Sequence, residues 1–157
     1  MTHRTLGKAL LLGLGALVSM TAVAAAQKPA EKGAGKLAWA PAPPFLPTGA
    51  KMAVVSGDPS KAGPYVLQLS MPGGYTIPPH QHPTDENLLI KSGAFRIGMG
   101  DKLDLKAMKV LKAGDKATAP AKMNHYAKAS GATVVEVSGV GPFQITYVAT
   151  GSSTVPK

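Results

Sequence analysis

The sequence predicts an all-β domain, built as an antiparallel sandwich or a barrel. No stretch keeps an apolar period of 3.6 residues, whereas several short runs are rich in β-branched residues and alternate with a period near two. Turn signals made of Gly, Pro and Asp separate these runs at short intervals. The chain has 157 residues, which is the length of one such domain with its flanking segments.

The first segment, residues 1–26, is typical of a secretion signal rather than of the domain. A positively charged start precedes an uncharged, mostly apolar run from Ala9 to Ala26, which ends in the A-x-A pattern of a cleavage site before Gln27. The alternative is an uncleaved membrane anchor, because the run approaches the minimum length of a spanning helix. We expect an exported protein, periplasmic or secreted, without a stable membrane anchor after cleavage.

Residues 27–50 form a leader rich in Ala, Pro, Lys and Gly. Its first ten residues are too polar and too small to bury a core, so we expect them to be disordered. Trp39, Phe45 and Leu46 stand between prolines and predict an extended arm that packs on the domain. Trp39 is expected to cover a sheet edge or a barrel end.

The β domain is expected over residues 51–150, followed by a tail at 151–157. Its apolar or alternating runs lie, in order, at 52–57, 65–71, 86–93, 94–100, 108–115, 116–130 and 133–148. The segment 101–108 is interpreted as part of a loop and an edge strand, and 133–148 as two strands joined by a turn. No internal repeat interrupts this order.

Charge and cysteine content exclude several function classes. The formal net charge is +9, but the basic residues of the domain are Lys spread along the chain, and its only Arg is Arg96. Recognition of phosphates and bases generally uses clustered Arg, so we expect no nucleic-acid function but an attraction for small anionic ligands. The absence of cysteine excludes disulfides and thiolate chemistry.

The segment from Gly74 to Gly93 carries the candidate functional residues. His80 and His82 are two residues apart, so in a strand both side chains point to one face. Glu86 would share the inward face of the next strand with Leu88 and Ile90, where a carboxylate is costly without a partner. His125 follows in a later segment of the same sheet system.

These four residues, His80, His82, Glu86 and His125, predict a site for one divalent transition-metal ion. Taken singly, each has a simpler interpretation, such as a packed core histidine or a surface carboxylate. Imidazole and carboxylate ligands suit Mn, Fe, Ni, Cu or Zn. The absence of thiolates argues against a closed structural zinc site.

Two motifs resemble those of the cupin superfamily. Gly74, His80-Gln81-His82, Glu86 and Gly93 have the spacing of the first cupin motif, and Gly114, Pro120 and His125 resemble the second. The resemblance covers about residues 51–148. It implies a small antiparallel jelly-roll barrel, or double-stranded β-helix, with His80, His82, Glu86 and His125 as metal ligands in its mouth.

The second motif departs from the family pattern at two positions. The family carries Gly two residues after the proline and Asn four residues after the histidine, where this sequence has Lys122 and Ala129. We expect Asn124 to supply the positive φ that the missing glycine would allow. Lys122 lies close to the expected mouth, where it could attract an anionic ligand.

Three functions fit this site. The first is a metal-dependent enzyme, a dioxygenase or an isomerase or lyase, that acts on a small carbonyl compound or organic acid. The second is a non-enzymatic protein that binds a sugar or an organic acid beside its metal, and the third is a module that the metal only braces. No catalytic acid or base stands out. The family resemblance also implies a homodimer. Candidates for substrate binding are Gln68, Tyr75, Met99, Tyr126, Gln144 and Tyr147.

Overall fold

The structure, a computed structural model, describes residues 36–149, which form eleven strands and no helix. The strands are β1 (Ala40–Pro41), β2 (Lys51–Ser56), β3 (Gly63–Met71), β4 (Thr76–Gln81), β5 (Glu86–Ser92), β6 (Ala94–Met99), β7 (Lys109–Lys112), β8 (Lys116–Ala119), β9 (His125–Ala129), β10 (Thr133–Gly141) and β11 (Thr146–Tyr147). The predicted signal (1–26), the start of the leader (27–35) and the tail (151–157) lie outside the described residues. Within 36–149 no helix meets the length and apolarity of a membrane span.

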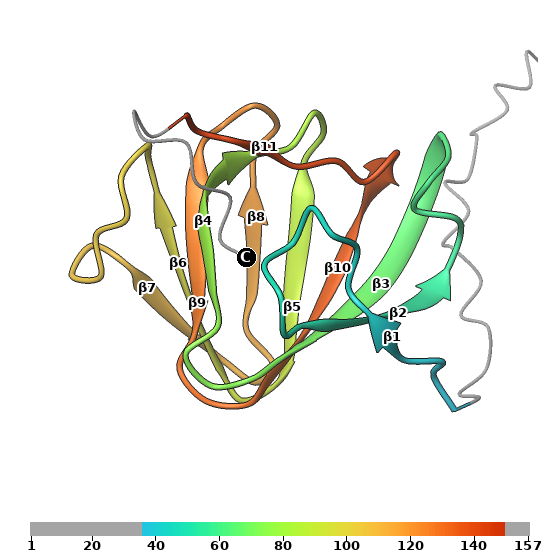
Figure 1. Cartoon of the computed structure of the whole chain (residues 1–157), viewed down its shortest axis with the longest axis horizontal. Helices are drawn as coiled ribbons and strands as arrows, with labels where there is room; N and C mark the ends of the chain where they lie inside the picture. Colours follow the sequence, from blue (N-terminus) through green and yellow to red (C-terminus); the bar gives the residue numbers. More distant parts are fainter. Residues whose placement is uncertain (1–35, 150–157) are drawn as a thin grey trace, which may run out of the picture.

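The strands form two antiparallel sheets, which confirms the predicted fold class. One sheet has the order β1-β2-β3-β10-β5-β8 and the other the order β11-β4-β9-β6-β7. Consecutive strands such as β4 and β5 lie in different sheets, which is the arrangement of a jelly roll. In Figure 1, β4, β9, β6 and β7 stand on the left and β5, β10 and β3 on the right. The segment 101–108 forms turns, and β7 after it is an edge strand, as the sequence predicts.

The space between the sheets is filled by the alternating apolar residues of the strands. In β3, every second residue from Tyr65 to Met71 is buried, and β10, its neighbour over nine residue pairs, buries Val135 and Val137 in the same way. Leu67 is fully inaccessible to solvent. Each such side chain removed from water stabilises the fold by about 1.5–3 kcal/mol.

The arm that precedes β2 is part of the barrel core. β1 pairs with β2, and the chain then turns through a proline-rich loop in which Leu46 is 5% exposed and belongs to the hydrophobic core. The hydroxyl of Tyr75 donates to the carbonyl oxygen of Pro47 (2.5 Å), and that of Tyr147 to Phe45 (2.8 Å). Leu46 therefore packs into the barrel core, whereas Trp39 stays 39% exposed before β1.

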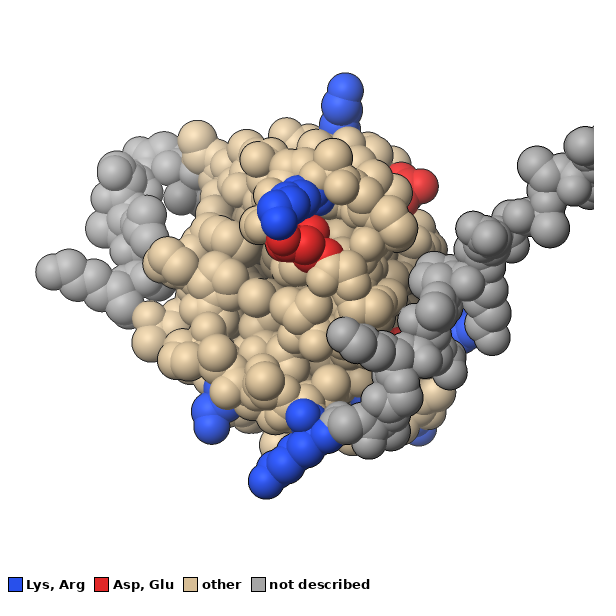
Figure 2. Space-filling view, turned by 90° about the vertical axis from the view of Figure 1, so that its right-hand side faces the viewer, with Lys and Arg blue, Asp and Glu red and all other residues tan. Residues whose placement is uncertain are grey.

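The side of the molecule shown in Figure 2 carries mainly uncharged side chains. The Lys and Arg side chains on it stand apart from one another and form no continuous basic stripe on this face. Nucleic-acid-binding domains commonly present such a stripe. The distribution on this face agrees with the spread of Lys along the sequence.

Tyr126 fixes the contact between β9 and β6. Its side chain is 1% exposed and covers Gly98, where an added Cβ would lie 2.3 Å from the Tyr126 ring. We expect Gly98→Ala to lower the free energy of unfolding by about 1–3 kcal/mol, because the ring has to move out of a packed position. Equilibrium unfolding in urea measures this change.

Gly131→Ala is the matched control for this variant. No atom lies within 4 Å of a Cβ built on Gly131, so the same substitution there should change stability by less than about 0.5 kcal/mol. Equal unfolding midpoints for the two variants would contradict the steric explanation.

Candidate metal centre

The prolines of β4 place His80 between two strands. Pro78 and Pro79 have no N–H to donate, and the register between β4 and β9 shifts between Ile77 and His80. After the shift, His80 pairs with His125 of β9 on one side and with Tyr147 of β11 on the other. The backbone of the first histidine is thus fixed from both edges.

The loop from His82 to Glu86 is held by three hydrogen bonds to neighbouring segments. The N–H of Lys122 donates to the carbonyl oxygen of His82 (2.8 Å), and Asp85 accepts from the N–H of Ala121 (2.8 Å). The Thr84 hydroxyl donates to the carbonyl oxygen of Val140 (2.8 Å). This loop joins β4 to β5, so it connects the two sheets while it positions His82.

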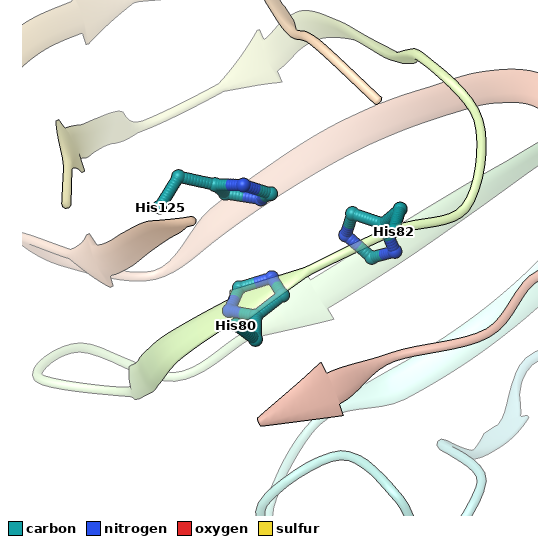
Figure 3. Close-up of side chains that lie close together, drawn as sticks. All are labelled: His80, His82 and His125. Carbon is teal, nitrogen blue, oxygen red and sulfur yellow. The ribbon is translucent and has the colours of Figure 1, made fainter. Parts of the chain in front are cut away.

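His80, His82 and His125 come together in space, as Figure 3 shows. One ring nitrogen of each lies within 4.8 Å of those of the other two, and all three side chains are buried. Two nitrogens bound to one ion at about 2.1 Å are at most about 4.2 Å apart, so a small side-chain rotation suffices. The three histidines could therefore bind a metal ion.

The hydrogen bonds of the three rings fix their tautomers. In each ring Nδ1 lies against a backbone carbonyl oxygen: that of Pro78 for His80 (2.6 Å), Gln144 for His82 (2.7 Å) and Met123 for His125 (3.0 Å). A carbonyl only accepts, so Nδ1 carries the hydrogen and Nε2 keeps its lone pair. This is the arrangement that orients a histidine ligand for a metal.

Two of these Nε2 atoms have no hydrogen-bond partner. Those of His82 and His125 are buried and unsatisfied within the described residues. Leaving such an atom unpaired costs about 1–3 kcal/mol, and a divalent ion would satisfy both. The orphaned atoms, the tautomers and the donor types together fit a transition-metal ion.

Glu86 lies beside two of the three histidines. Its carboxylate oxygens are 3.4 Å from His82 Nε2 and 3.5 Å from His125 Nε2, and its side chain points inward with Leu88 and Ile90, as the sequence predicts. Burial alone would raise the pKa of this carboxyl, but the imidazoles of His125 and His82 outweigh it and hold the pKa low. Glu86 therefore supplies a buried negative charge.

Burial and neighbouring charges shift the pKa values of His80 and His82 in opposite directions. Burial, followed by the charge of His125, lowers the pKa of His80 to about 4, so His80 is neutral at pH 7. Burial also opposes protonation of His82, but the Glu86 carboxylate, 3.4 Å from its Nε2, outweighs burial and raises the His82 pKa. A neutral His80 beside an anionic Glu86 is the protonation state that cation binding requires.

A small cavity lies beside His80 and His125, and the volume in it that is open to the centre of a water-sized group is about 20 Å³. Its polar lining comes from His80, Glu86 and His125, and its other lining residues are apolar. Leu46 of the arm and Phe143 close part of it. The candidate metal centre thus borders an apolar space inside the barrel.

Four of the six predicted substrate-binding residues lie away from this cavity. Gln68 alternates with buried residues of β3, faces outward and donates to Glu136 (2.9 Å). Tyr75 packs at the arm, Tyr126 covers Gly98 with its hydroxyl 3.3 Å from the carbonyl oxygen of Asp104, and Met99 is 46% exposed. None of these four lines the space behind the histidines.

The other two residues lie at the centre but act through different groups. Gln144 contributes its backbone carbonyl, which accepts from His82, while its side chain is exposed. The ring of Tyr147 lies 5.8 Å from that of His80, between centroids, and is 37% exposed. Tyr147 is therefore the one predicted residue whose side chain borders a histidine of the site.

Phe143 is a site residue that the sequence did not reveal. Its ring stacks on that of His82, with centroids 5.5 Å apart and an angle of 17° between the planes. It also contacts the rings of Phe45 and Tyr65. The signal was weak, because a phenylalanine in a Gly-Pro-Phe turn is typical of plain packing, and its contact with His82 depends on how the chain returns after β10.

The expectation that Asn124 takes a positive φ is wrong. Lys122 itself does so, with φ at 60°, and no other non-glycine residue in the described part of the chain shares this conformation. The turn between β8 and β9 places a left-handed residue at the position where the resembled motif carries glycine, and the N–H of that residue donates to the carbonyl oxygen of His82. The position of the turn is kept although the glycine is absent.

We expect Lys122→Gly to stabilise the protein by about 0.5–1 kcal/mol, since glycine adopts this conformation without the steric cost that lysine has. The same change at Lys128, within β9, should destabilise by about 0.5–1 kcal/mol. Urea unfolding of both variants measures the difference. Equal shifts for the two would show that the backbone conformation of residue 122 is not strained.

Comparison with known proteins gives a family match for part of the domain. Residues 66–140 match the family model described as a cupin domain. The fold is similar to that of an RmlC-like cupin from Shewanella frigidimarina, with 16% identity over 67% of this chain and 84% of that chain, and a TM-score of 0.53. No curated protein matches the sequence.

Two further solved structures share the fold. One is described as a "putative acetylacetone dioxygenase" from Methylibium petroleiphilum, 16% identical over 82% of this chain and 89% of that chain, with a TM-score of 0.59. The other is KdgF from Halomonas sp., 21% identical over 66% of this chain and 84% of that chain, with a TM-score of 0.51. At these identities the likeness concerns the fold.

Proposed function

We propose, from the match of residues 66–140 to a cupin-domain model and from the histidine group, that this protein is an exported metal-dependent enzyme acting on a small carbonyl compound or organic acid. His80, His82, Glu86 and His125 would hold one divalent ion of Fe, Mn, Ni, Cu or Zn. The observation that carries the proposal is the shared orientation of the three rings. Each donates from Nδ1 to a backbone carbonyl, one nitrogen of each lies within 4.8 Å of one in each of the other two, and the Nε2 atoms of His82 and His125 both lie beside Glu86.

The proposed ligand set would leave coordination positions of the metal open. Four protein ligands leave up to two positions on an octahedral ion, where it would polarise a carbonyl or activate a bound small molecule. The chain contributes the rest: three rings held in place by main-chain hydrogen bonds, the negative charge of Glu86, and apolar walls that exclude water from the reacting groups.

A non-enzymatic binding protein with a bound metal is the alternative. It is favoured by one observation: among the described residues that line the cavity, His80, Glu86 and His125 are the only groups that can exchange a proton, and all three are candidate ligands. An enzyme of this design would rely on the metal for its acid or base chemistry. A binding protein needs no such group.

Elemental analysis of the protein purified from its native compartment tests the proposal. We expect close to one transition-metal ion per chain, and iron would favour oxygen chemistry whereas zinc or nickel would favour isomerase or lyase chemistry. The loaded protein is then assayed for turnover of small carbonyl compounds, with and without O₂. Binding of these compounds without turnover supports the alternative, and a chain free of transition metal in that compartment rejects both.

A further inference from the structure

The cavity behind the histidines also constrains what the site can bind. We propose that its ligand is a small molecule with a single metal-binding polar group and an uncharged apolar end of methyl to ethyl size. This inference rests on the proposed metal site and narrows its substrate class. Sugars and dicarboxylates, which carry polar groups along their whole length, would be excluded.

Most of the cavity lining is apolar. Apart from His80, Glu86 and His125, the cavity is lined by apolar residues such as Leu69, Ile77 and Val137, none of which can donate or accept a hydrogen bond through its side chain. The strand backbones there already pair within the two sheets. A ligand hydroxyl placed in this part of the cavity would therefore stay unpaired, which weakens binding by about 10- to 100-fold.

The charged groups around the cavity disfavour a second carboxylate on the ligand. Glu86 already places a carboxylate beside the histidines, and no Lys or Arg is among the cavity-lining residues of the described chain. A second ligand carboxylate directed inward would meet apolar side chains and the negative charge of Glu86. The lysines of the protein can attract an anion to the surface, but none reaches this space.

The volume of the cavity also limits the length of the ligand's apolar end. The volume open to the centre of a water-sized group is only about 20 Å³, so the cavity takes a short group rather than an extended chain. A methyl or ethyl group matches this space and a longer chain does not. Most of the wall is made by strands paired on both sides, so it has little freedom to widen.

Within the described residues, Leu46 is one of three wall residues, with Phe143 and Ile145, that lie outside the strands. It comes from the proline-rich arm, and hydrogen bonds at its two neighbours hold it: Phe45 accepts from Tyr147 and Pro47 from Tyr75. Its side chain is buried and lines the cavity. Shortening this one side chain should enlarge the space without altering any histidine contact.

Titration of the Co²⁺-loaded protein with a series of hydroxamates tests the inference, with visible absorption of the ion as the readout. All members share one chelating group and differ in the tail: methyl, ethyl, hydroxymethyl, carboxyethyl and pentyl. We expect the methyl and ethyl members to bind with similar affinity. The hydroxymethyl member, which matches ethyl in size, should bind about 10- to 100-fold more weakly. The carboxyethyl and pentyl members should be weaker than ethyl as well.

Leu46→Ala should reduce the ratio of the pentyl and methyl dissociation constants by at least about tenfold, because it adds space to the cavity. It should leave the weaker binding of the hydroxymethyl member unchanged, because it adds no polar partner. Val54→Ala, at an exposed position of β2, is the matched control and should keep the wild-type order. Should Leu46→Ala fail to fold, the wild-type series still decides between the outcomes.

The outcomes of this titration test the metal site and the ligand class separately. Failure of the wild-type protein to bind Co²⁺ would reject the proposed function. Binding of Co²⁺ with equal affinities for the ethyl and hydroxymethyl members would overturn the inference and leave the metal site intact. Binding of Co²⁺ with no spectral response to any hydroxamate would also overturn it, since the site would then accept no ligand.

Discussion

Replacement of His125 by alanine is expected to lower the affinity for the metal by more than about 100-fold. Loss of an outer hydrogen-bond partner of a ligand already costs about 10- to 100-fold, and loss of the ligand itself costs more. His125 is one of three rings whose nitrogens converge, and its Nε2 lies 3.5 Å from Glu86. Competition with a coloured chelator measures the dissociation constants of both proteins.

Tyr126→Phe is the control for this variant. Tyr126 follows His125 directly but packs on Gly98, and its hydroxyl meets the carbonyl oxygen of Asp104, so the change leaves the metal centre untouched. The control should bind metal as the wild type does. Retention of wild-type affinity by His125→Ala would remove His125 from the ligand set, and with it the convergence on which the metal proposal depends.

Metal binding should raise the thermal stability of the protein by a large amount. The metal-free protein buries two Nε2 atoms without partners, and an ion that binds only the folded chain stabilises it by mass action. At a free metal concentration 1,000 times the dissociation constant, the gain is about 4 kcal/mol. For a domain of this size it corresponds to a rise in Tm of about 10–20 °C.

Differential scanning calorimetry with and without the metal measures this shift. His125→Ala, at the same total metal concentration, should show a much smaller rise, which separates site-specific binding from a general effect of the salt. Superimposable melting curves for the loaded and the metal-free wild type would contradict the prediction.

Local alternation was enough to predict the fold class. Runs such as 65–71 place every second residue in the core, and β3 has this pattern because its one face packs against the opposite sheet. The same alternation shows that Gln68, between Leu67 and Leu69, faces outward, so its candidacy for substrate binding conflicted with a signal already present. The side chains of Tyr75 and Tyr126 are buried in packing contacts, which their residue types alone do not reveal.

The grouping of the histidines could be predicted in part. The spacing of His80 and His82 defines a common direction, and the structure brings His125 next to them through the pairing of β4 with β9. The contacts of Phe143 and Leu46 could not be predicted, because both reach the centre through irregular segments whose course depends on the finished barrel. The conformation of Lys122 was assigned to the wrong residue, since sequence alone does not show which residue of a turn takes the left-handed position.

The three oxygens that orient the imidazoles belong to the peptide groups of Pro78, Met123 and Gln144 and not to their side chains. Substitutions at residues 123 and 144 can therefore accumulate during evolution while the orienting oxygens stay in place. The orientation of the imidazoles therefore does not depend on the side chains at those positions. A selection experiment for altered reactivity would find few productive mutations there.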